Sequence, residues 1–346
     1  MSDTKWSLPS PVLEEDGFAY YSADTAPLSL YGVFREGDCY VRLPREVAIQ
    51  TSDNVAALQN NCAGGRVRFR TDSPRIAFRY TSHAICRMNH FPLSGSAGLD
   101  LYTREDGEER WIYGFIPTEN REYQSTVTVP YPGMHTYTLN LPTYAGIKEV
   151  LIGIEKEAHW EPAEPYKIEK PVVFYGSSIT QGGCSSRPGN TYEACLSRAL
   201  DFHFINLGFS GCCRAEIPMM EYIRSLDMSL FVYDYDHNSY QREELTERHA
   251  RGYRMVREAH PDLPILLMNR PKFELDGEET LRREVIFDTY RQAREAGDRN
   301  IYFVDNRALM AFARYDGTVD GCHPNDLGFY SMAQALEPVI REILYH

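Results

Sequence analysis

The apolar positions of this chain follow two different periods, one in each half. Up to about residue 155, apolar and polar residues alternate in short runs that are separated by Gly, Pro and Asn. Such alternation predicts strands with one face in a core and one in solvent, arranged as an antiparallel β-sandwich. The runs lie at residues 67–69, 76–80, 99–101, 111–115, 127–129, 137–141 and 150–154.

The second half shows short, nearly continuous apolar runs that alternate with longer amphipathic stretches. Continuous runs predict strands of a parallel sheet covered on both faces, and the stretches between them predict helices. The runs lie at residues 172–175, 203–207, 230–233, 265–268 and 301–304, and the helical stretches at 191–200, 242–260, 278–296 and close to the C-terminus. Five β-α units predict a doubly wound α/β domain of the flavodoxin-like kind.

A proline-containing segment separates the two patterns. Trp160–Pro165 contains two prolines close together, which oppose both a helix and an interior strand. A chain of 346 residues is also long enough for two domains that each bury a core. We therefore expect the sandwich domain over residues 1–165 and the α/β domain over residues 166–346.

Charge and composition limit the partners. The formal net charge of -13 repels phosphate backbones and anionic lipid, so we expect neither nucleic acid nor membrane as a partner. The start, Met1–Trp6, has neither the basic nor the apolar region of a signal peptide, and no later run is long enough to cross a bilayer. We expect a cytoplasmic protein, and we leave its oligomeric state open, a homo-oligomer included.

The cysteines do not follow a metal-binding pattern. The chain has eight, including the adjacent pair Cys212 and Cys213, but no Cys-x-x-Cys and no Cys/His spacing suited to zinc. His237 beside Asp236 does not change this, because one histidine and one carboxylate do not fill a site. We expect reduced, mostly buried thiols, with no metal site and no cofactor.

Polar residues that suit acyl chemistry follow the predicted parallel strands. Ligands bind beyond the carboxyl ends of such strands, so we expect these residues to gather at one edge of the sheet. A serine hydroxyl attacks a carbonyl when an imidazole takes its proton and a carboxylate fixes the imidazole tautomer. Ser178, His323 and Asp320 supply these three groups. The pattern predicts hydrolysis or transfer of an acyl group.

Four blocks of the second half resemble, in order, those of the SGNH hydrolases, also called the GDSL esterase superfamily. They are Gly176-Ser177-Ser178-Ile179, Asn206-Leu207-Gly208-Phe209-Ser210-Gly211, a loop containing Asn238, and Asp320 with His323-Pro324. The resemblance implies a flavodoxin-like sheet with Ser178 as nucleophile, His323 as its base and Asp320 as the orienting carboxylate. It also implies an oxyanion hole made by the N–H groups of Ser178 and Gly211 and the side chain of Asn238. The family's usual Asp before the nucleophile is Ser177 here, so we expect one supporting hydrogen-bond acceptor to be missing.

The first half extends the resemblance. Gly98-Leu99-Asp100-Leu101-Tyr102 is similar to the Gly-x-Asp-Leu-Tyr signature of a β-sandwich domain that precedes one SGNH subgroup. Members of that subgroup resemble carbohydrate esterases and, in some cases, acyltransferases. The resemblance therefore implies a small-molecule acyl ester as substrate, with an acylated carbohydrate as the first choice.

Three functions stay open from the sequence. The first is an esterase that removes a short acyl group, acetyl before others, from a carbohydrate or another polar alcohol. The second is an acyltransferase with the same nucleophile, in which an acceptor alcohol replaces water. The third is a sugar-binding protein whose α/β half is catalytically inactive.

Several further residues have a weaker claim to the site. Ser210 is a rival nucleophile because its segment nearly matches the Gly-x-Ser-x-Gly elbow, but Cys212 stands where the final glycine is needed, so we interpret Ser210 as a loop residue. Arg270, after the fourth predicted strand, and His237 are expected to bind substrate. The loop from His83 to His90 is a further candidate for substrate contact.

Overall fold

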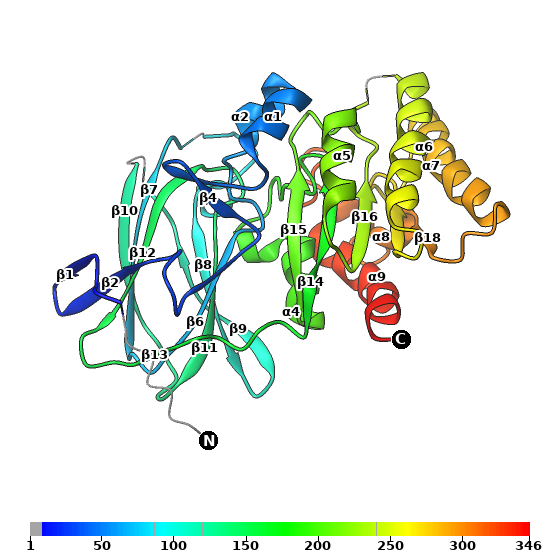
Figure 1. Cartoon of the computed structure of the whole chain (residues 1–346). Helices are drawn as coiled ribbons and strands as arrows, with labels where there is room; N and C mark the ends of the chain where they lie inside the picture. The colour runs from blue at the N-terminus through cyan, green and yellow to red at the C-terminus, as the bar shows by residue number, and fades with distance from the viewer. Residues whose placement is uncertain (1–8, 86, 119–120, 240) are drawn as a thin grey trace.

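The chain folds into a pair of antiparallel sheets beside a parallel sheet flanked by helices (Figure 1). This computed structural model describes residues 9–85, 87–118, 121–239 and 241–346. The Met1–Trp6 start, and Cys86 among the eight cysteines expected to be reduced, lie outside the described residues. None of the helices in these ranges is both long and apolar enough to cross a membrane.

The first half is an antiparallel β-sandwich, as the period-two alternation predicts. One sheet has the strand order β1 (Leu13–Glu15), β2 (Phe18–Ser22), β12 (Ile147–Glu155), β7 (Arg75–Ser82) and β10 (Glu122–Thr128). The other has the order β13 (Trp160–Glu161), β6 (Arg66–Thr71), β11 (His135–Asn140), β8 (Leu99–Glu105) and β9 (Glu108–Phe115), with β3 (Ser29–Tyr31) also paired to β6. On β7, Ile76, Phe78 and Tyr80 are buried in the core between the sheets, while Arg79 and Thr81 alternate with them and remain partly accessible.

The second half is the predicted doubly wound sheet. Its five parallel strands have the order β15 (Phe202–Gly208), β14 (Ile168–Gly176), β16 (Leu230–Asp234), β17 (Ile265–Met268) and β18 (Ile301–Val304). The helices α4 (Tyr192–Leu200) and α9 (Asp326–Tyr345) pack together on one face, and α5 (Ile217–Ser225), α6 (Arg242–Ala259) and α7 (Gly277–Glu295) cover the other. Val172 and Phe174 of β14 belong to the first face's core, and Val173 and Tyr175 to the second. Burial on both faces explains why these strands read as continuous apolar runs.

Short elements were not predicted. They include helices α1 (Arg45–Thr51), α2 (Asp53–Leu58), α3 (Leu93–Ser96) and α8 (Asn306–Leu309), the hairpin of β4 (Phe34–Glu36) with β5 (Cys39–Val41), and α5. The elements other than α5 have three to seven residues and span at most two helical turns, so they present too few apolar positions for a period to show. In α2, for example, the local signal is the cap: the Ser52 hydroxyl accepts a hydrogen bond from the N–H of Val55.

Buried polar contacts join the sandwich to the α/β half. Asp100, the acid of the Gly-x-Asp-Leu-Tyr segment, is fully buried and accepts hydrogen bonds from the N–H of Gly189 at 3.0 Å and from Arg187 at 3.2 Å. Arg42, also buried, donates from Nη1 to the carbonyl of Gly208 at 2.5 Å. These contacts tie the sandwich to the segment that follows β14 and to the end of β15.

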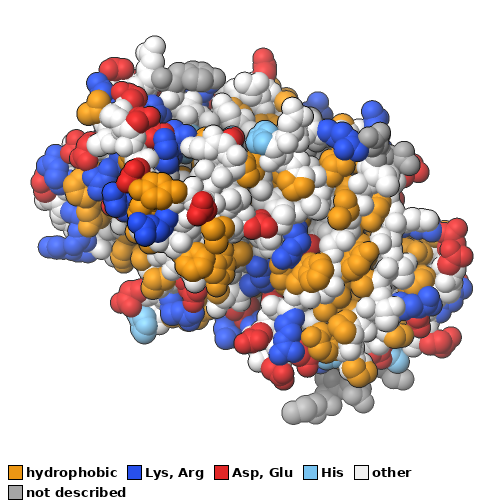
Figure 2. All heavy atoms as spheres, turned by 180° about the vertical axis from the view of Figure 1, so that it is seen from behind, with side chains coloured by type: hydrophobic (Ala, Val, Ile, Leu, Met, Phe, Trp, Pro, Cys, Tyr) orange, Lys and Arg blue, Asp and Glu red, His pale blue; other side chains and the backbone are white. Residues whose placement is uncertain are grey.

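The surface carries both signs of charge. On the face opposite to that of Figure 1, acidic, basic and apolar side chains are interspersed (Figure 2). The excess of acidic residues in the sequence therefore does not gather into one patch on this face.

Candidate active site

Ser178 stands in a tight turn directly after β14. Its carbonyl accepts a hydrogen bond from the N–H of Gly183 at 2.8 Å, and the residue is 8% exposed. The preceding Gly176 has no room for a side chain, because a Cβ there would lie 1.9 Å from Oγ1 of Thr180. The turn therefore depends on glycine for its close packing and holds the serine at the carboxyl edge of the sheet.

The structure brings the three residues predicted for acyl chemistry together. The Ser178 Oγ lies 3.0 Å from Nε2 of His323, and Nδ1 of His323 lies 2.7 Å from Oδ2 of Asp320. A carboxylate can only accept a hydrogen bond, so Nδ1 carries the ring hydrogen and Nε2 presents its lone pair to the serine hydroxyl. A base, its nucleophile and its orienting acid thus lie in one line of hydrogen bonds.

Asp320 is held by its other oxygen as well. Oδ1 accepts the N–H groups of Cys322 at 2.9 Å and of His323 at 2.8 Å. Burial alone would raise the pKa of Asp320, but the hydrogen bonds from the backbone and side chain of His323 and from Cys322 outweigh it and lower the pKa to about 2. The carboxylate of Asp320 therefore stays ionised at neutral pH.

The groups predicted for an oxyanion hole lie in the loops after β14, β15 and β16. Gly211 has a φ of 74°, in the left-handed region that favours glycine. The carbonyl oxygen of the Asn238 side chain accepts the N–H of Cys213 at 3.1 Å, which leaves its NH₂ end without an acceptor among the described residues. Among the residues that the structure describes, the backbone N–H groups of Ser178 and Gly211 also have no protein acceptor. Three donors are thus free for a ligand oxygen.

Ser177 does not leave the gap that the sequence suggested. Its hydroxyl accepts a hydrogen bond from the N–H of Ile179 at 3.2 Å. The expectation of a missing acceptor is wrong, because a serine oxygen can cap the turn after the strand as a carboxylate would.

His237 and Arg270 lie beside the site, and each already has a protein contact. Nδ1 of His237 is 3.6 Å from Sγ of Cys322, the residue before His323. Burial, reinforced by the positive charge of Arg270, holds the pKa of His237 well below its usual range, so the ring is neutral. Arg270 pairs with Glu279 at 2.7 Å, which neutralises much of its charge. Their predicted part in substrate binding stays a prediction.

Ser210 has the contacts of a loop residue. Its N–H donates to Oε1 of Gln181 at 2.9 Å, and its hydroxyl contacts the phenol of Tyr144. No imidazole is hydrogen bonded to Ser210 within the described ranges. The geometry thus favours Ser178 over Ser210 as the nucleophile.

Several residues around the site were not found from the sequence. Gln181 links the first two blocks through Ser210 and donates from Nε2 to the carbonyl of Thr143 at 3.2 Å. From the sandwich, the Tyr144 hydroxyl donates to the carbonyl of Ser178 at 3.3 Å, and the ring of His90 lies 5.5 Å from the ring of His323. Of these residues, only His90 belongs to a segment that the sequence had suggested, the loop from His83 to His90. The sandwich therefore forms part of the wall around the nucleophile.

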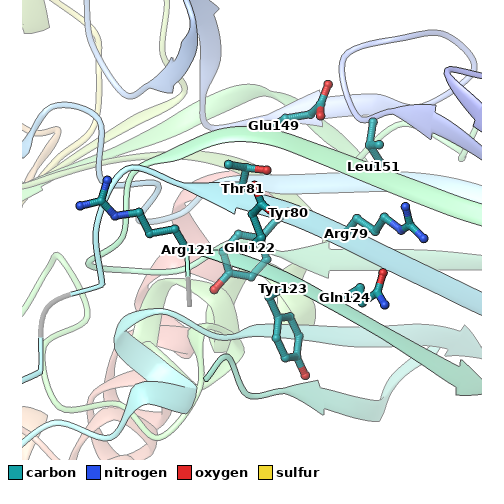
Figure 3. Close-up of a pocket in the computed structure, with 9 residues that line it drawn as sticks. All are labelled: Arg79, Tyr80, Thr81, Arg121, Glu122, Tyr123, Gln124, Glu149 and Leu151. Carbon is teal, nitrogen blue, oxygen red and sulfur yellow. The ribbon is translucent and has the colours of Figure 1, made fainter. Parts of the chain in front are cut away.

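The sandwich has a hollow that lies away from the Ser178 cluster. On the outer face of the first sandwich sheet, residues of β7, β10 and β12 line a hollow of about 770 Å³ (Figure 3). It includes Arg79, Arg121, Glu122 and Glu149, but no member of the Ser178 cluster. No serine, cysteine or histidine of the described residues lines this hollow, so it is not where we expect the acyl chemistry to take place.

Both halves of the chain match known families. Residues 169–341 match the GDSL-like lipase/acylhydrolase family, and residues 18–160 match the GxDLY domain, the N-terminus of SGNH-hydrolase-type esterases. Among curated protein sequences, none is significantly similar to this chain.

Solved structures share the fold over nearly the whole chain. A GDSL-like lipase from Bacteroides ovatus is 31% identical, with a TM-score of 0.85 over 94% of this chain and 98% of that one. The salicylyl-acyltransferase SsfX3 of a tetracycline biosynthetic pathway is 21% identical, with a TM-score of 0.75 over 95% and 98%. A family two carbohydrate esterase from Clostridium thermocellum, in complex with cellohexaose, is 14% identical, with a TM-score of 0.58 over 81% and 92%.

The line of hydrogen bonds at the sheet edge and the family match over half of the chain lead to the same identification. The chain is a hydrolase of the GDSL-like lipase/acylhydrolase family, also called SGNH hydrolases, and carries the GxDLY sandwich domain at its N-terminal side.

Proposed function

We propose that this protein is a serine esterase that removes a short acyl group, acetyl before others, from a carbohydrate or another polar alcohol. The observation that carries the proposal is the 3.0 Å contact between the Ser178 Oγ and Nε2 of His323, with Asp320 hydrogen bonded to the opposite ring nitrogen. Ser178 is the nucleophile, His323 the general base and acid, and Asp320 the residue that orients it.

The first half-reaction forms an acyl-enzyme. Nε2 of His323 takes the hydroxyl proton as the Ser178 Oγ bonds to the ester carbonyl carbon. The N–H groups of Ser178 and Gly211 and the amide of Asn238 stabilise the resulting oxyanion, each contributing about 3 kcal/mol. The tetrahedral intermediate then breaks its bond to the alcohol oxygen, which takes the proton from His323. In the second half-reaction, His323 takes a proton from water as the water oxygen bonds to the acyl carbon. The bond to the Ser178 Oγ then breaks, the free acid leaves, and the serine oxygen takes the proton from His323.

The surroundings of His323 support a polar alcohol as the leaving group. The ring of His90 lies 5.5 Å from that of His323, and the sandwich loop that carries it lines a hollow of about 450 Å³. The lining combines the polar side chains of Arg87, Asn89 and His90 with the apolar ones of Met88, Phe91, Pro92 and Leu93. A sugar offers both hydroxyl groups and apolar C–H faces, so a mixed lining of this kind suits it. The fold shared with a carbohydrate esterase in complex with cellohexaose is the reason for naming a carbohydrate first.

Hydrolysis of p-nitrophenyl acetate, butyrate and octanoate tests this proposal. We expect the wild type to prefer acetate, Ser178→Ala to lose at least about a thousandfold in kcat/KM, and Ser210→Ala to stay close to wild type. Equal rates for wild type and Ser178→Ala would remove Ser178 from the mechanism.

Acyl transfer is a second candidate, because the fold is shared with a salicylyl-acyltransferase. The 8% exposure of Ser178 also limits the access of water to an acyl-enzyme. Addition of a sugar or glycerol to the ester assay separates the two functions. Formation of acylated acceptor in preference to free acid would identify a transferase, whereas unchanged acid release would identify an esterase.

A further inference from the structure

Three metal-binding side chains from distant segments meet at the nucleophile's base. One nitrogen each of His90 and His323 and the Sγ of Cys184 all lie within 4.8 Å of one another. His90 comes from the sandwich loop and is exposed, Cys184 follows the nucleophile turn and is buried, and His323 is partly buried. No zinc-like spacing is visible in the sequence, because each of these side chains lies on a different segment.

The arrangement is close to what a zinc-like ion needs. In a tetrahedral site with two nitrogens and one sulfur, the donor atoms lie about 3.3–3.6 Å apart, with a water as fourth ligand. Because His90 is exposed, rotation of its side chain can close the remaining gap. A Cβ placed on Gly183 would lie 3.6 Å from Cδ2 of His323, so the ring edge that contains Nε2 faces the backbone next to Cys184.

We propose that His90, Cys184 and His323 form a binding site for a thiophilic divalent cation of the zinc class, which reversibly inhibits the enzyme. The cation binds the lone pairs of His90 and His323 and the Cys184 sulfur, whose proton passes to solvent. The Nε2 lone pair of His323 then no longer accepts the hydrogen of Ser178, so the nucleophile is not activated. The inhibitory consequence depends on the proposed esterase function, whereas binding of the ion does not.

Two features set this cluster apart from the others in the described ranges. Asp38, Cys39 and His83 also group within 4.8 Å, but none of them contacts the nucleophile or its base. Cys322 is adjacent to His323 in sequence, yet its sulfur is directed to His237. Cys39 and Cys322 therefore serve as matched controls for Cys184.

Cobalt(II) titration tests binding without any activity measurement. On the full chain, Co²⁺ bound through Cys184 should give a thiolate-to-cobalt charge-transfer band in the near ultraviolet. We expect the band in wild type, in the inactive Ser178→Ala, and in Cys39→Ser and Cys322→Ser. We expect it to disappear in Cys184→Ser and to require at least about tenfold more cobalt in His90→Ala, because one of three protein ligands is lost.

Zinc chloride inhibition of ester hydrolysis tests the consequence. The zinc concentration for half inhibition should rise at least about tenfold in His90→Ala, measured against that variant's own uninhibited rate, and EDTA should restore activity. His90→Ala keeps the test decisive if the buried Cys184→Ser does not fold.

A missing band, a band that survives Cys184→Ser or that depends on Cys39 or Cys322, or inhibition unchanged by His90→Ala would each overturn the proposal. Absence of esterase activity together with the cobalt band would instead contradict the proposed function and leave the metal site intact.

Discussion

The two oxygens of Asp320 have separate contacts. Oδ2 accepts the ring N–H of His323, and Oδ1 accepts two backbone N–H groups of the same turn. The carboxylate is thus fixed by its own turn, and the imidazole is fixed by the carboxylate. An orienting residue that cannot rotate holds one tautomer of its histidine.

Asp320→Asn separates the orienting role from the structural one. Oδ1 of the asparagine can keep both backbone contacts, but its NH₂ would face Nδ1 and favour the tautomer with hydrogen on Nε2. We expect kcat to fall on the order of a thousandfold to ten-thousandfold with little change in thermal unfolding. Steady-state kinetics with p-nitrophenyl acetate checks this, and a kcat within about threefold of wild type would contradict it.

Asn238 combines a structural contact through its oxygen with a proposed catalytic one through its NH₂ group. Asn238→Ala removes both, whereas Asn238→Asp keeps the acceptor for Cys213, removes the donor and adds a negative charge beside the oxyanion. We expect kcat to fall about a hundredfold in the alanine variant and at least as much in the aspartate variant, and only the alanine variant to lose about 1 kcal/mol of unfolding free energy. Activity in Asn238→Asp equal to wild type would exclude the side chain from the oxyanion hole.

Sequence reasoning reached the residues that lie in local motifs and missed those that act across the chain. Ser178, Asp320 and His323 occupy fixed positions in turns after strands, so their types and spacing were visible. Gln181 and Tyr144 support these turns through contacts with residues at least 29 positions away. No local pattern encodes such contacts, because they arise only when the sheet and the sandwich pack together.

At the scale of elements, the turn that carries Ser178 is hydrogen bonded to a buried acid, Asp234, at the end of β16. The hydroxyl of Thr180 donates to Oδ2 of Asp234 at 2.8 Å, and both residues are almost fully buried. Burial, with the nearby charge of Asp236, raises the pKa of Asp234 to about 7, despite the hydrogen bonds from Thr180 and Tyr192.

The raised pKa predicts how stability depends on pH. The group titrates near 3.8 when unfolded, so between pH 3.8 and about 7 the folded state holds a proton that the unfolded state has released. Its stabilising contribution is fully present below pH 3.8 and is lost as pH rises through about 7. Relative to Asp234→Asn, the unfolding free energy of wild type should therefore fall across this range and then level off. Urea unfolding of both proteins checks this, and a pH-independent difference would contradict it.

The long helices and the buried parallel strands were predicted from the sequence, whereas the shortest helices were not. Each of the five parallel strands coincides with a continuous apolar run, and α6 and α7 match their predicted ranges to within one residue at each end. The one-turn helix α3 contains the segment Leu93–Ser96, in which no apolar period can repeat. Its position is set by packing: a Cβ on Gly95 would lie 1.9 Å from the carbonyl of Ser185.

At the scale of the whole molecule, the sandwich holds the site in place through Asp100. The buried carboxylate accepts a hydrogen bond from Asn140 within its own sheet and from Gly189 and Arg187 across the interface. Arg187 follows Cys184 by three residues and also donates to the hydroxyl of Tyr102 at 2.8 Å. The Asp-Leu-Tyr part of the signature thus connects the two halves.

Asp100→Ala should weaken this connection. It leaves Arg187, whose side chain is 27% exposed, without its carboxylate, and we expect the unfolding free energy to fall by about 3 kcal/mol. The control Glu108→Ala, at a side chain 79% exposed, should change it by less than about 0.5 kcal/mol. Urea unfolding measures both, and equal stabilities of the two variants would show that Asp100 does not hold the halves together.

The account as a whole depends on activation of Ser178 by a histidine 145 positions further along the chain. Labelling with a fluorophosphonate probe, followed by peptide mass spectrometry, tests this most directly, because only an activated hydroxyl reacts. We expect one adduct, on the peptide that contains Ser178, in wild type and in Ser210→Ala, and none in Ser178→Ala or His323→Ala. An unlabelled wild type, or an adduct on Ser210, would contradict the account.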